Sequence, residues 1–490
     1  MVSTLDWSLL RRAVEVVSKC RNCRSESTLC CVFLNEVIPA MKRMQFWVVI
    51  LMGISIVLGL PGCSRNDGMK KLTGTGKIVV TGCDWGPAIT KVILSVPEEL
   101  DQEQHLSPDL FVLQETRKPF DSKKIVNRTV TDIYFSDENG NRIETSEPGN
   151  EISHISLDLH YSPEEGSPFY YDGFNRWLAR YSLEVKMQTG KALQLSNHDQ
   201  FTLDDLTIAF KNKPDPGSVL LPETAEVHTE GVFTGKEGNS FTYASFSPAN
   251  ASEENKRPLV IWLHGAGEGG NDPLITIYGN KVTALVGDEF QKIMDGAYIL
   301  VPQTSSVWKR NENGDYFSNE NPGDHSMYLH DLKELIDQYA NVNHVDKNRI
   351  IVGGCSNGGF MAMDLILHYP DYFSAAYPIC EMYEPELISD EKLEGIKDLP
   401  IWFIYAANDA TVVPALYEEP LLKRLDEIGT KNIHVTVFSD VHDTSGKYEK
   451  DGKPYPYYGH WSWIYFFNNE CVDENLSVWQ WLSEQRKQPM

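Results

Sequence analysis

A Gly-x-Ser-x-Gly sequence centred on Ser356 constrains the fold of this chain more than any other stretch. The apolar run 350–352 before it is short and is followed by glycine, as expected for a buried strand of a parallel sheet. Residues 360–368 after it are apolar enough for a buried helix. The serine therefore lies at a sharp strand-to-helix turn, where Gly354 and Gly358 are needed because larger side chains would collide as strand and helix close together. Three fixed residues alone make a modest signal, so the order of the surrounding elements decides their meaning.

The composition is that of a folded, acidic protein. The chain has 490 residues, of which 41% are hydrophobic and 23% charged, enough for two globular domains beyond a targeting segment. The formal net charge of -25 argues against a nucleic-acid partner, because phosphate binding needs a basic face. The excess of acidic residues predicts a solvated acidic surface.

Residues 41–62 have the order of a bacterial lipoprotein signal. Met41 opens a basic segment, 46–60 is apolar and uncharged, and Leu-Pro-Gly-Cys ends the pattern at Cys63. An apolar stretch of about 15 residues is short for a membrane helix, which needs roughly 20. We therefore expect cleavage before Cys63, lipidation of Cys63, a tether over 63–75 and anchoring in the cell envelope. An uncleaved anchor and plain secretion are the alternatives.

A signal sequence normally begins the chain, so residues 1–40 before it are an unexpected leader. We interpret them as misannotated or non-native. Four cysteines between residues 20 and 31 do not fit a zinc site, because no second ligand pair with zinc-finger spacing follows. The mature chain would keep too few cysteines for a disulfide framework, although a single disulfide bridge remains an alternative. These cysteines are Cys63, Cys83, Cys355, Cys380 and Cys471.

Residues 76–222 predict an all-β domain. The clearest strand, 155–161, alternates with period two and so has one apolar face, and Asn139-Gly140 is typical of a hairpin turn. Without a convincing helix, an immunoglobulin-like β-sandwich is the simplest architecture, with Trp85 in its core rather than on a ligand platform. The expected strands are 77–81, 90–96, 110–114, 130–135, 155–161 and 177–185.

A Pro- and Gly-containing segment, 214–224, marks the boundary to a second domain, 223–490. After it, strands and helices alternate, as in a mostly parallel sheet covered by helices on both faces. This order is that of an α/β-hydrolase. The expected strands are 241–246, 259–263, 297–301, 350–352, 373–379, 401–406 and 433–438, and the expected helices are 327–339, 360–368 and one ending over 479–482.

The glycine-rich loop 264–270 follows a predicted strand. It lacks the Gly-Lys-Ser/Thr of a phosphate-binding loop and the spacing of a dinucleotide fingerprint, which disfavours nucleotide binding. In a hydrolase such a loop can aim a backbone N–H at a developing oxyanion. We assign these oxyanion donors to Ala266, with Gly267 as second choice, and to Asn357. Glu268 is interpreted as a carboxylate that braces the loop rather than contacting substrate.

The acid and the base of a triad should follow the last strands of the sheet. Asp409 comes directly after strand 401–406 and would orient a histidine. Two histidines follow the final strand: His442 is nearer to it, whereas His460 lies beyond an insertion. Together with Asp440 and Asp443, His442 could hold a hard metal, but without a fourth ligand we interpret these residues as a polar loop.

Several segments, in order along the chain, resemble EstA-type bacterial serine esterases. These are α/β-hydrolases with an N-terminal immunoglobulin-like domain, related to polyhydroxybutyrate-depolymerase-like and prolyl-oligopeptidase-like enzymes. The segment around His460 resembles their Gly-His-x-x-Trp-x-x-x-Tyr sequence and favours His460 over His442, although Phe467 stands where the pattern has tyrosine and Tyr465 is the nearest one. The resemblance covers most of the mature chain and rests on residues 82–94, 263–270, 354–358, 378–381, 401–414 and 459–465.

The resemblance implies a serine carboxylesterase that hydrolyses a small-molecule ester through an acyl-enzyme, with Ser356 as nucleophile, His460 as base and Asp409 as its orienting acid. A prolyl-oligopeptidase-like peptidase stays open, because triad residues do not separate ester from amide cleavage. So does a catalytically inert surface protein whose sandwich binds polysaccharide. We expect no cofactor, no metal and no nucleic-acid partner. The sequence is compatible with a homo-oligomer and does not determine acyl preference.

Overall fold

The computed structural model describes residues 69–119, 122–144 and 151–487. The predicted leader, the signal and the lipidation site at Cys63 lie outside these residues. Within the described part of the chain, no helix is both long and apolar enough to span a membrane. Lys70–Leu72, inside the predicted tether, form a strand that pairs with residues 201–203.

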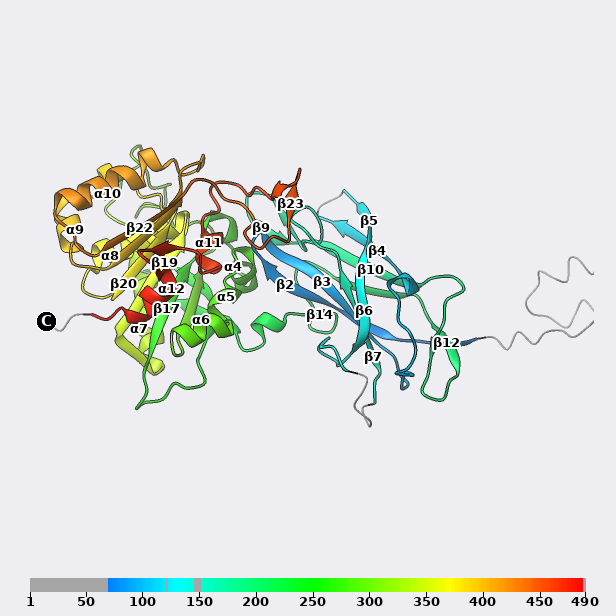
Figure 1. Cartoon of the computed structure of the whole chain (residues 1–490). Coiled ribbons are helices and arrows are strands. Elements are labelled where there is room, and N and C mark those ends of the chain that lie inside the picture. The colour runs from blue at the N-terminus through cyan, green and yellow to red at the C-terminus, as the bar shows by residue number, and fades with distance from the viewer. Residues whose placement is uncertain (1–68, 120–121, 145–150, 488–490) are drawn as a thin grey trace, which may run out of the picture. The chain divides into compact units, whose positions relative to one another are not determined.

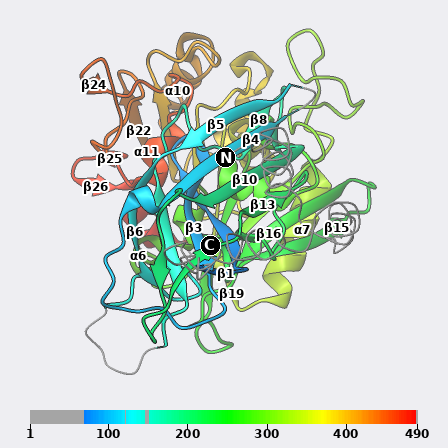
Figure 2. The ribbon, with the colours of Figure 1, turned by 90° about the vertical axis from the view of Figure 1, so that its right-hand side faces the viewer.

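Residues 70–220 form the sandwich, whose strands are drawn in colours from blue to green in Figures 1 and 2. Tyr181, Leu183 and Val185 are buried and alternate with more exposed neighbours, as one apolar face requires. The prediction of an immunoglobulin-like domain is confirmed. Its strands are β1 (Lys70–Leu72), β2 (Thr75–Cys83), β3 (Gly86–Ser95), β4 (Phe111–Lys118), β5 (Lys124–Arg128), β6 (Val130–Ser136), β7 (His154–Leu159), β8 (Phe169–Tyr171), β9 (Asn175–Trp177), β10 (Arg180–Met187), β11 (Leu193–Gln194), β12 (Gln200–Leu203), β13 (Leu206–Phe210) and β14 (Val219–Leu220).

The two larger sheets of the sandwich have the orders β14-β2-β3-β7-β6 and β13-β10-β4-β5. The prediction of one strand over 177–185 is wrong. The strand is interrupted at Leu178, whose N–H donates to the Pro168 carbonyl at 2.9 Å. As a result, β9 pairs with β8 as a separate hairpin. Trp85 packs against the hydrophobic core cluster, as predicted, but its side chain is only half-buried. Its ring also packs edge-on against Tyr448, with the ring centroids 4.6 Å apart.

An eight-stranded sheet with the order β15-β16-β18-β17-β19-β20-β21-β22 forms the second domain. The strands from β18 to β22 run parallel, and β15 and β16 add antiparallel pairs at one edge. The α/β-hydrolase prediction is confirmed. The strands are β15 (His228–Thr234), β16 (Ser240–Phe246), β17 (Arg257–Leu263), β18 (Tyr298–Gln303), β19 (Val345–Cys355), β20 (Ala375–Ile379), β21 (Ile401–Ala406) and β22 (Ile433–Phe438), followed by the short pairs β23 (Glu449–Lys450), β24 (Lys453–Pro454), β25 (Val472–Asp473) and β26 (Leu476–Ser477).

Central strands of this sheet are buried on both faces. In β17, Val260 and Trp262 join one hydrophobic cluster, whereas Leu259, Ile261 and Leu263 join the other. A run that is apolar at every position therefore satisfies both faces at once.

Helices cover this sheet, and α8 packs directly against β17, β19 and β20. Three of the described helices begin with side-chain caps: Asp272 accepts the Leu274 N–H at 3.2 Å, Ser389 accepts the Lys392 N–H at 3.2 Å, and Ser477 forms a capping box with Gln480. The helices are α4 (Pro273–Gly279), α5 (Thr283–Val286), α6 (Asp288–Ile293), α7 (Leu329–Val342), α8 (Asn357–His368), α9 (Asp390–Gly395), α10 (Glu418–Glu427), α11 (Trp463–Phe467) and α12 (Val478–Glu484), with the short 3-10 turn η4 (Ala266–Glu268) in the glycine-rich loop.

Candidate active site

Ser356 lies at the turn between β19 and α8 in a strained conformation, with φ 55° and ψ -114°. A Cβ at Gly354 would lie 2.4 Å from the Leu263 carbonyl oxygen, and one at Gly358 would lie 2.0 Å from the same atom. The elbow therefore needs both glycines because β17 passes directly against it. The Ser356 N–H donates to the Ile379 carbonyl at 2.8 Å, which ties the turn to β20.

Asp409 and His460 form a buried pair. The His460 Nδ1–H donates to Asp409 Oδ2 at 2.6 Å, and the two residues are 8% and 4% exposed. The other carboxylate oxygen, Oδ1, accepts the N–H groups of Thr411 at 2.8 Å and Val412 at 2.9 Å. These bonds fix the carboxylate, and the Nδ1 bond leaves Nε2 of His460 as the nitrogen available for proton transfer.

The structure brings His460, and not His442, against Asp409. His442 pairs with Asp440 at 2.5 Å, and its side chain is 42% exposed. Asp443 accepts the Ser445 hydroxyl at 2.8 Å and so closes its own turn. Before His460, a Cβ on Gly459 would lie 2.4 Å from Asn408 Oδ1, so glycine is needed where the histidine loop passes the aspartate loop.

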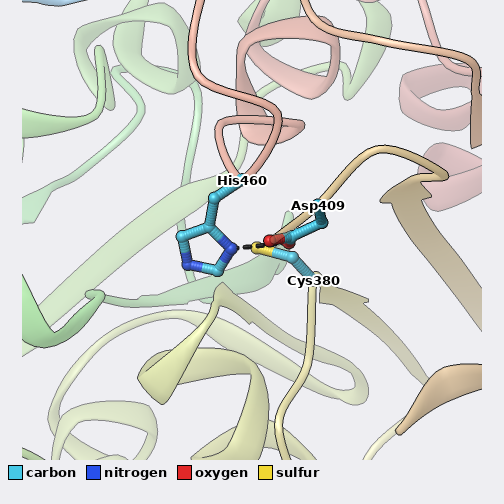
Figure 3. A group of neighbouring side chains, drawn as sticks. All are labelled: Cys380, Asp409 and His460. Carbon is cyan, nitrogen blue, oxygen red and sulfur yellow. Dashed lines mark hydrogen bonds and ion pairs between the residues drawn. The ribbon is translucent and has the colours of Figure 1, made fainter. Parts of the chain in front are cut away.

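Cys380 lies beside this pair, as Figure 3 shows. Of the residues described, Cys380, Asp409 and His460 are the one group of three whose ligand-type atoms all lie within 4.8 Å of one another. Burial raises the pKa of the Cys380 thiol well above its ordinary value, which keeps it protonated. A neutral thiol and an imidazole already bonded to its carboxylate do not make a prepared metal site.

The predicted oxyanion donors lie at the starts of two helical segments, α8 and η4. Asn357 is the first residue of α8, where backbone N–H groups have no partner within the helix. Ala266 begins η4, and a Cβ on the preceding Gly265 would be in van der Waals contact with the Cys355 sulfur, at 3.4 Å. His264 anchors the start of this loop, because its Nε2 accepts the Thr304 N–H at 3.2 Å.

Glu268 braces the loop, as expected from the sequence. It is 5% exposed, and its carboxylate accepts the amide N–H of Asn175, on β9, at 2.7 Å. Its backbone carbonyl accepts the Gln303 side chain at 2.8 Å. Burial raises the pKa of Glu268 to about 7.

The hairpin β8–β9 of the sandwich reaches the same loop. Trp177 donates from Nε1 to Asp272 at 3.1 Å, and Arg176 donates to the Gly269 carbonyl at 3.3 Å. A Cβ on Gly267 would lie 3.7 Å from the Tyr171 ring. These contacts could not be predicted from the sequence, because turn and strand signals do not reveal which distant loop a hairpin meets.

Sequence reasoning also missed Met382 and Lys309. The Met382 sulfur lies 3.9 Å from Ser356 Oγ, and the Lys309 ammonium donates to the Met382 carbonyl at 2.5 Å. Met382 follows a parallel strand, β20, which was the available signal, since functional side chains gather at that edge of a parallel sheet.

The eight-stranded sheet and the helices that cover it place the chain among the α/β-hydrolases. Residues 248–448 match the family described as phospholipase/carboxylesterase, and residues 76–216 match the esterase immunoglobulin-like N-terminal domain. The two matches follow one another along the chain in the order expected from the sequence, and the predicted EstA-type resemblance is confirmed.

Known proteins are similar over parts of the chain. The acylamino-acid-releasing enzyme of Sus scrofa is 24% identical over 226 residues, 43% of this chain and 27% of that enzyme. Poly(3-hydroxyalkanoate) depolymerase C of Paucimonas lemoignei is 28% identical over 135 residues, 27% of this chain and 28% of that protein. The chain thus spans less than a third of each. A thermostable esterase of known structure has a TM-score of 0.65 at 24% identity, over 84% of this chain and 99% of its own, which supports the fold.

Proposed function

We propose that this chain is a serine carboxylesterase that hydrolyses small-molecule carboxylic esters through an acyl-enzyme. The observation that carries the proposal is the buried His460–Asp409 bond of 2.6 Å in a hydrolase sheet that also holds Ser356 at a strained turn. Residues 379–382 connect the two halves of this site. Ile379 binds the Ser356 N–H, Cys380 lies beside His460 and Asp409, and Met382 faces the Ser356 hydroxyl.

In acylation, Ser356 Oγ attacks the ester carbonyl carbon while its proton passes to Nε2 of His460. The Ser356 hydroxyl must turn from the Met382 sulfur toward this nitrogen, and such bonds commonly tighten only when substrate binds. The N–H groups of Ala266 and Asn357 stabilise the oxyanion. His460 then protonates the departing alkoxide, which leaves as the alcohol.

In deacylation, water attacks the acyl-enzyme and gives a proton to His460. The second tetrahedral intermediate collapses, the proton returns to Ser356, and the carboxylic acid leaves. Asp409 remains ionised and stabilises the imidazolium in both halves of the cycle.

Hydrolysis of p-nitrophenyl acetate by Ser356→Ala tests the proposal. We expect kcat to fall at least about 10⁴-fold, because the nucleophile is lost, with the circular dichroism spectrum and Tm unchanged. Activity near wild type would refute the mechanism. Acylated peptide amides, assayed in parallel, identify a peptidase if they alone are cleaved.

We also propose that the mature protein is exported and anchored through a lipidated Cys63. The proposal rests on the signal-like order of residues 41–63. Metabolic labelling with an alkyne fatty acid should mark the wild type and not Cys63→Ala. A mature protein that still carries residues 1–40 would contradict the proposal.

A further inference from the structure

Met382 borders the space beside the nucleophile. Its sulfur lies 3.9 Å from Ser356 Oγ and 3.9 Å from the Asn357 side-chain amide. Met382 is partly exposed, whereas its neighbours Tyr383 and Glu381 are buried. A substrate bonded to Ser356 must therefore share space with this thioether.

The backbone around Met382 is held in one conformation. Cys380 has φ 37°, in the left-handed region, and its N–H donates to the Ile404 carbonyl at 2.8 Å. The Tyr383 N–H donates to the Glu381 carboxylate at 2.7 Å, and the Tyr383 ring stacks on Phe360 with the centroids 4.8 Å apart. Met382 is thus presented from a fixed segment.

Lys309 fixes this segment from the other side. Its side chain is 1% exposed, and its ammonium donates to the Met382 carbonyl at 2.5 Å and to Glu384 at 2.8 Å. The same ammonium lies 5.5 Å from the centroids of the Phe360 and Tyr417 rings. Burying a charge is unfavourable unless it is paired, and here the pairing joins Lys309 to both ends of 382–384.

The backbone of Lys309 is tied to the proposed oxyanion donor. Asn357 Oδ1 accepts the N–H of Trp308 at 2.6 Å and that of Lys309 at 3.3 Å. Lys309 therefore connects the start of α8 with the Met382 segment, and this connection holds the Met382 backbone in place relative to Asn357.

We propose that Met382 is a specificity-determining residue that limits the acyl group, and that Lys309 is the positioning residue that holds it. The proposal rests on the proposed esterase function. A short acyl group fits beside the thioether, whereas a longer chain must displace a side chain whose backbone cannot move. A single methylene in a fixed apolar pocket changes discrimination by roughly 10- to 200-fold.

The test compares kcat/KM for p-nitrophenyl acetate and hexanoate. We expect Met382→Ala to raise the hexanoate-to-acetate ratio about tenfold or more, and Met382→Leu, of similar volume, to change it less than about threefold. Met187→Ala is the matched control, because Met187 is likewise partly exposed and lies on β10 of the sandwich. An unchanged ratio in Met382→Ala overturns the proposal. A change confined to acetates of larger alcohols overturns the acyl assignment.

Lys309→Met tests the positioning role. We expect the acyl ratio to shift in the same direction as in Met382→Ala, with a raised KM for the acetate. Lys333→Met is the control, because Lys333 is likewise paired with a carboxylate, Asp337, and lies over an aromatic ring, but on α7. If Lys309→Met does not fold, Glu384→Gln is the second variant, because it weakens the ion pair between Lys309 and Glu384. A folded variant of either kind with an unshifted ratio refutes the role.

Labelling with a fluorophosphonate separates this inference from the proposed function. The probe reports whether Ser356 is a nucleophile, whatever the acyl selectivity. Labelling with an unchanged acyl ratio overturns only the role of Met382. Absence of labelling in the wild type overturns the esterase proposal itself.

Discussion

Glu268 has a buried carboxyl group whose ionisation affects the loop that carries Ala266. Burial raises its pKa to about 7, above the ordinary value of 4.5. The folded protein therefore retains a proton that the unfolded chain releases. This contribution to stability is fully present below about pH 4.5 and is lost as the pH rises through 7.

We expect Glu268→Gln to remove this pH dependence. The free energy of unfolding of the wild type minus that of the variant should fall by on the order of 3 kcal/mol between pH 4 and pH 8. One unit of pKa shift corresponds to about 1.4 kcal/mol. Urea unfolding at a series of pH values measures it. Burial lowers the pKa of His264 to about 4, an opposite effect that both proteins share and that cancels. A pH-independent difference would contradict the assignment.

The two histidines give a second prediction. His460→Ala should reduce kcat for p-nitrophenyl acetate at least about 10⁴-fold, because no base then accepts the serine proton. His442→Ala should retain activity, because His442 pairs with Asp440 at the surface. The reverse pattern would move the general base to His442.

Site residues close to the sequence motifs could be predicted, whereas residues that contact the site from distant positions in the sequence could not. The order of the strands was enough to expect Asp409 and a histidine at one site, and the steric argument for Gly354 and Gly358 matches the closeness of Leu263. Asn175 is 93 positions from Glu268, and Lys309 is 75 from Glu384. No periodicity links such pairs, because they meet only when distant segments of the chain pack together.

At the scale of elements, the turn between β19 and α8 depends on the close passage of β17. We expect Gly358→Ala to destabilise the protein by more than about 3 kcal/mol or to prevent folding, because the new methyl group would lie 2.0 Å from a backbone oxygen. Gly395→Ala, on α9, is the control, because the nearest atom to its Cβ would be 3.8 Å away. Thermal unfolding compares the two variants, and equal stability would refute the steric role of Gly358.

Strands with strong local patterns were predicted, whereas strands defined by their partners were not. Residues 259–263 are apolar throughout and form most of β17. The break between β9 and β10 was missed because the apolar pattern continues through it. Its cause is the pairing of β9 with β8 and the bond from Leu178 to Pro168, both of which depend on tertiary structure.

At the scale of the whole molecule, one hydrophobic cluster includes residues of both domains. Ile78 and Val80 of the sandwich belong to the same cluster as Tyr278, Val282 and Leu285. Lys281 adds a polar link, since its ammonium donates to Asp84 at 2.9 Å and to Asn468 at 2.7 Å. We infer that residues 70–487 unfold cooperatively.

Calorimetry should therefore show a single unfolding transition. Lys281→Met should lower stability by about 1–3 kcal/mol, because Asp84, 9% exposed, would lose its cation, while the transition stays single. Lys236→Met is the control, because Lys236 also pairs with a carboxylate, that of Glu334, but its side chain is 86% exposed. This substitution should not change stability measurably. Two resolved transitions in the wild type would refute the cooperativity.

We expect the thioether beside Ser356 to make the protein sensitive to oxidants. Hydrogen peroxide can transfer one oxygen atom to the Met382 sulfur and leave as water, giving a sulfoxide whose oxygen accepts hydrogen bonds more strongly. Burial raises the pKa of the Cys83 thiol to about 12 and raises the pKa values of Cys355, Cys380 and Cys471 well above the ordinary value, so these thiols react slowly. Peroxide should therefore inactivate the folded wild type and spare Met382→Leu, with peptide mass spectrometry locating the added oxygen.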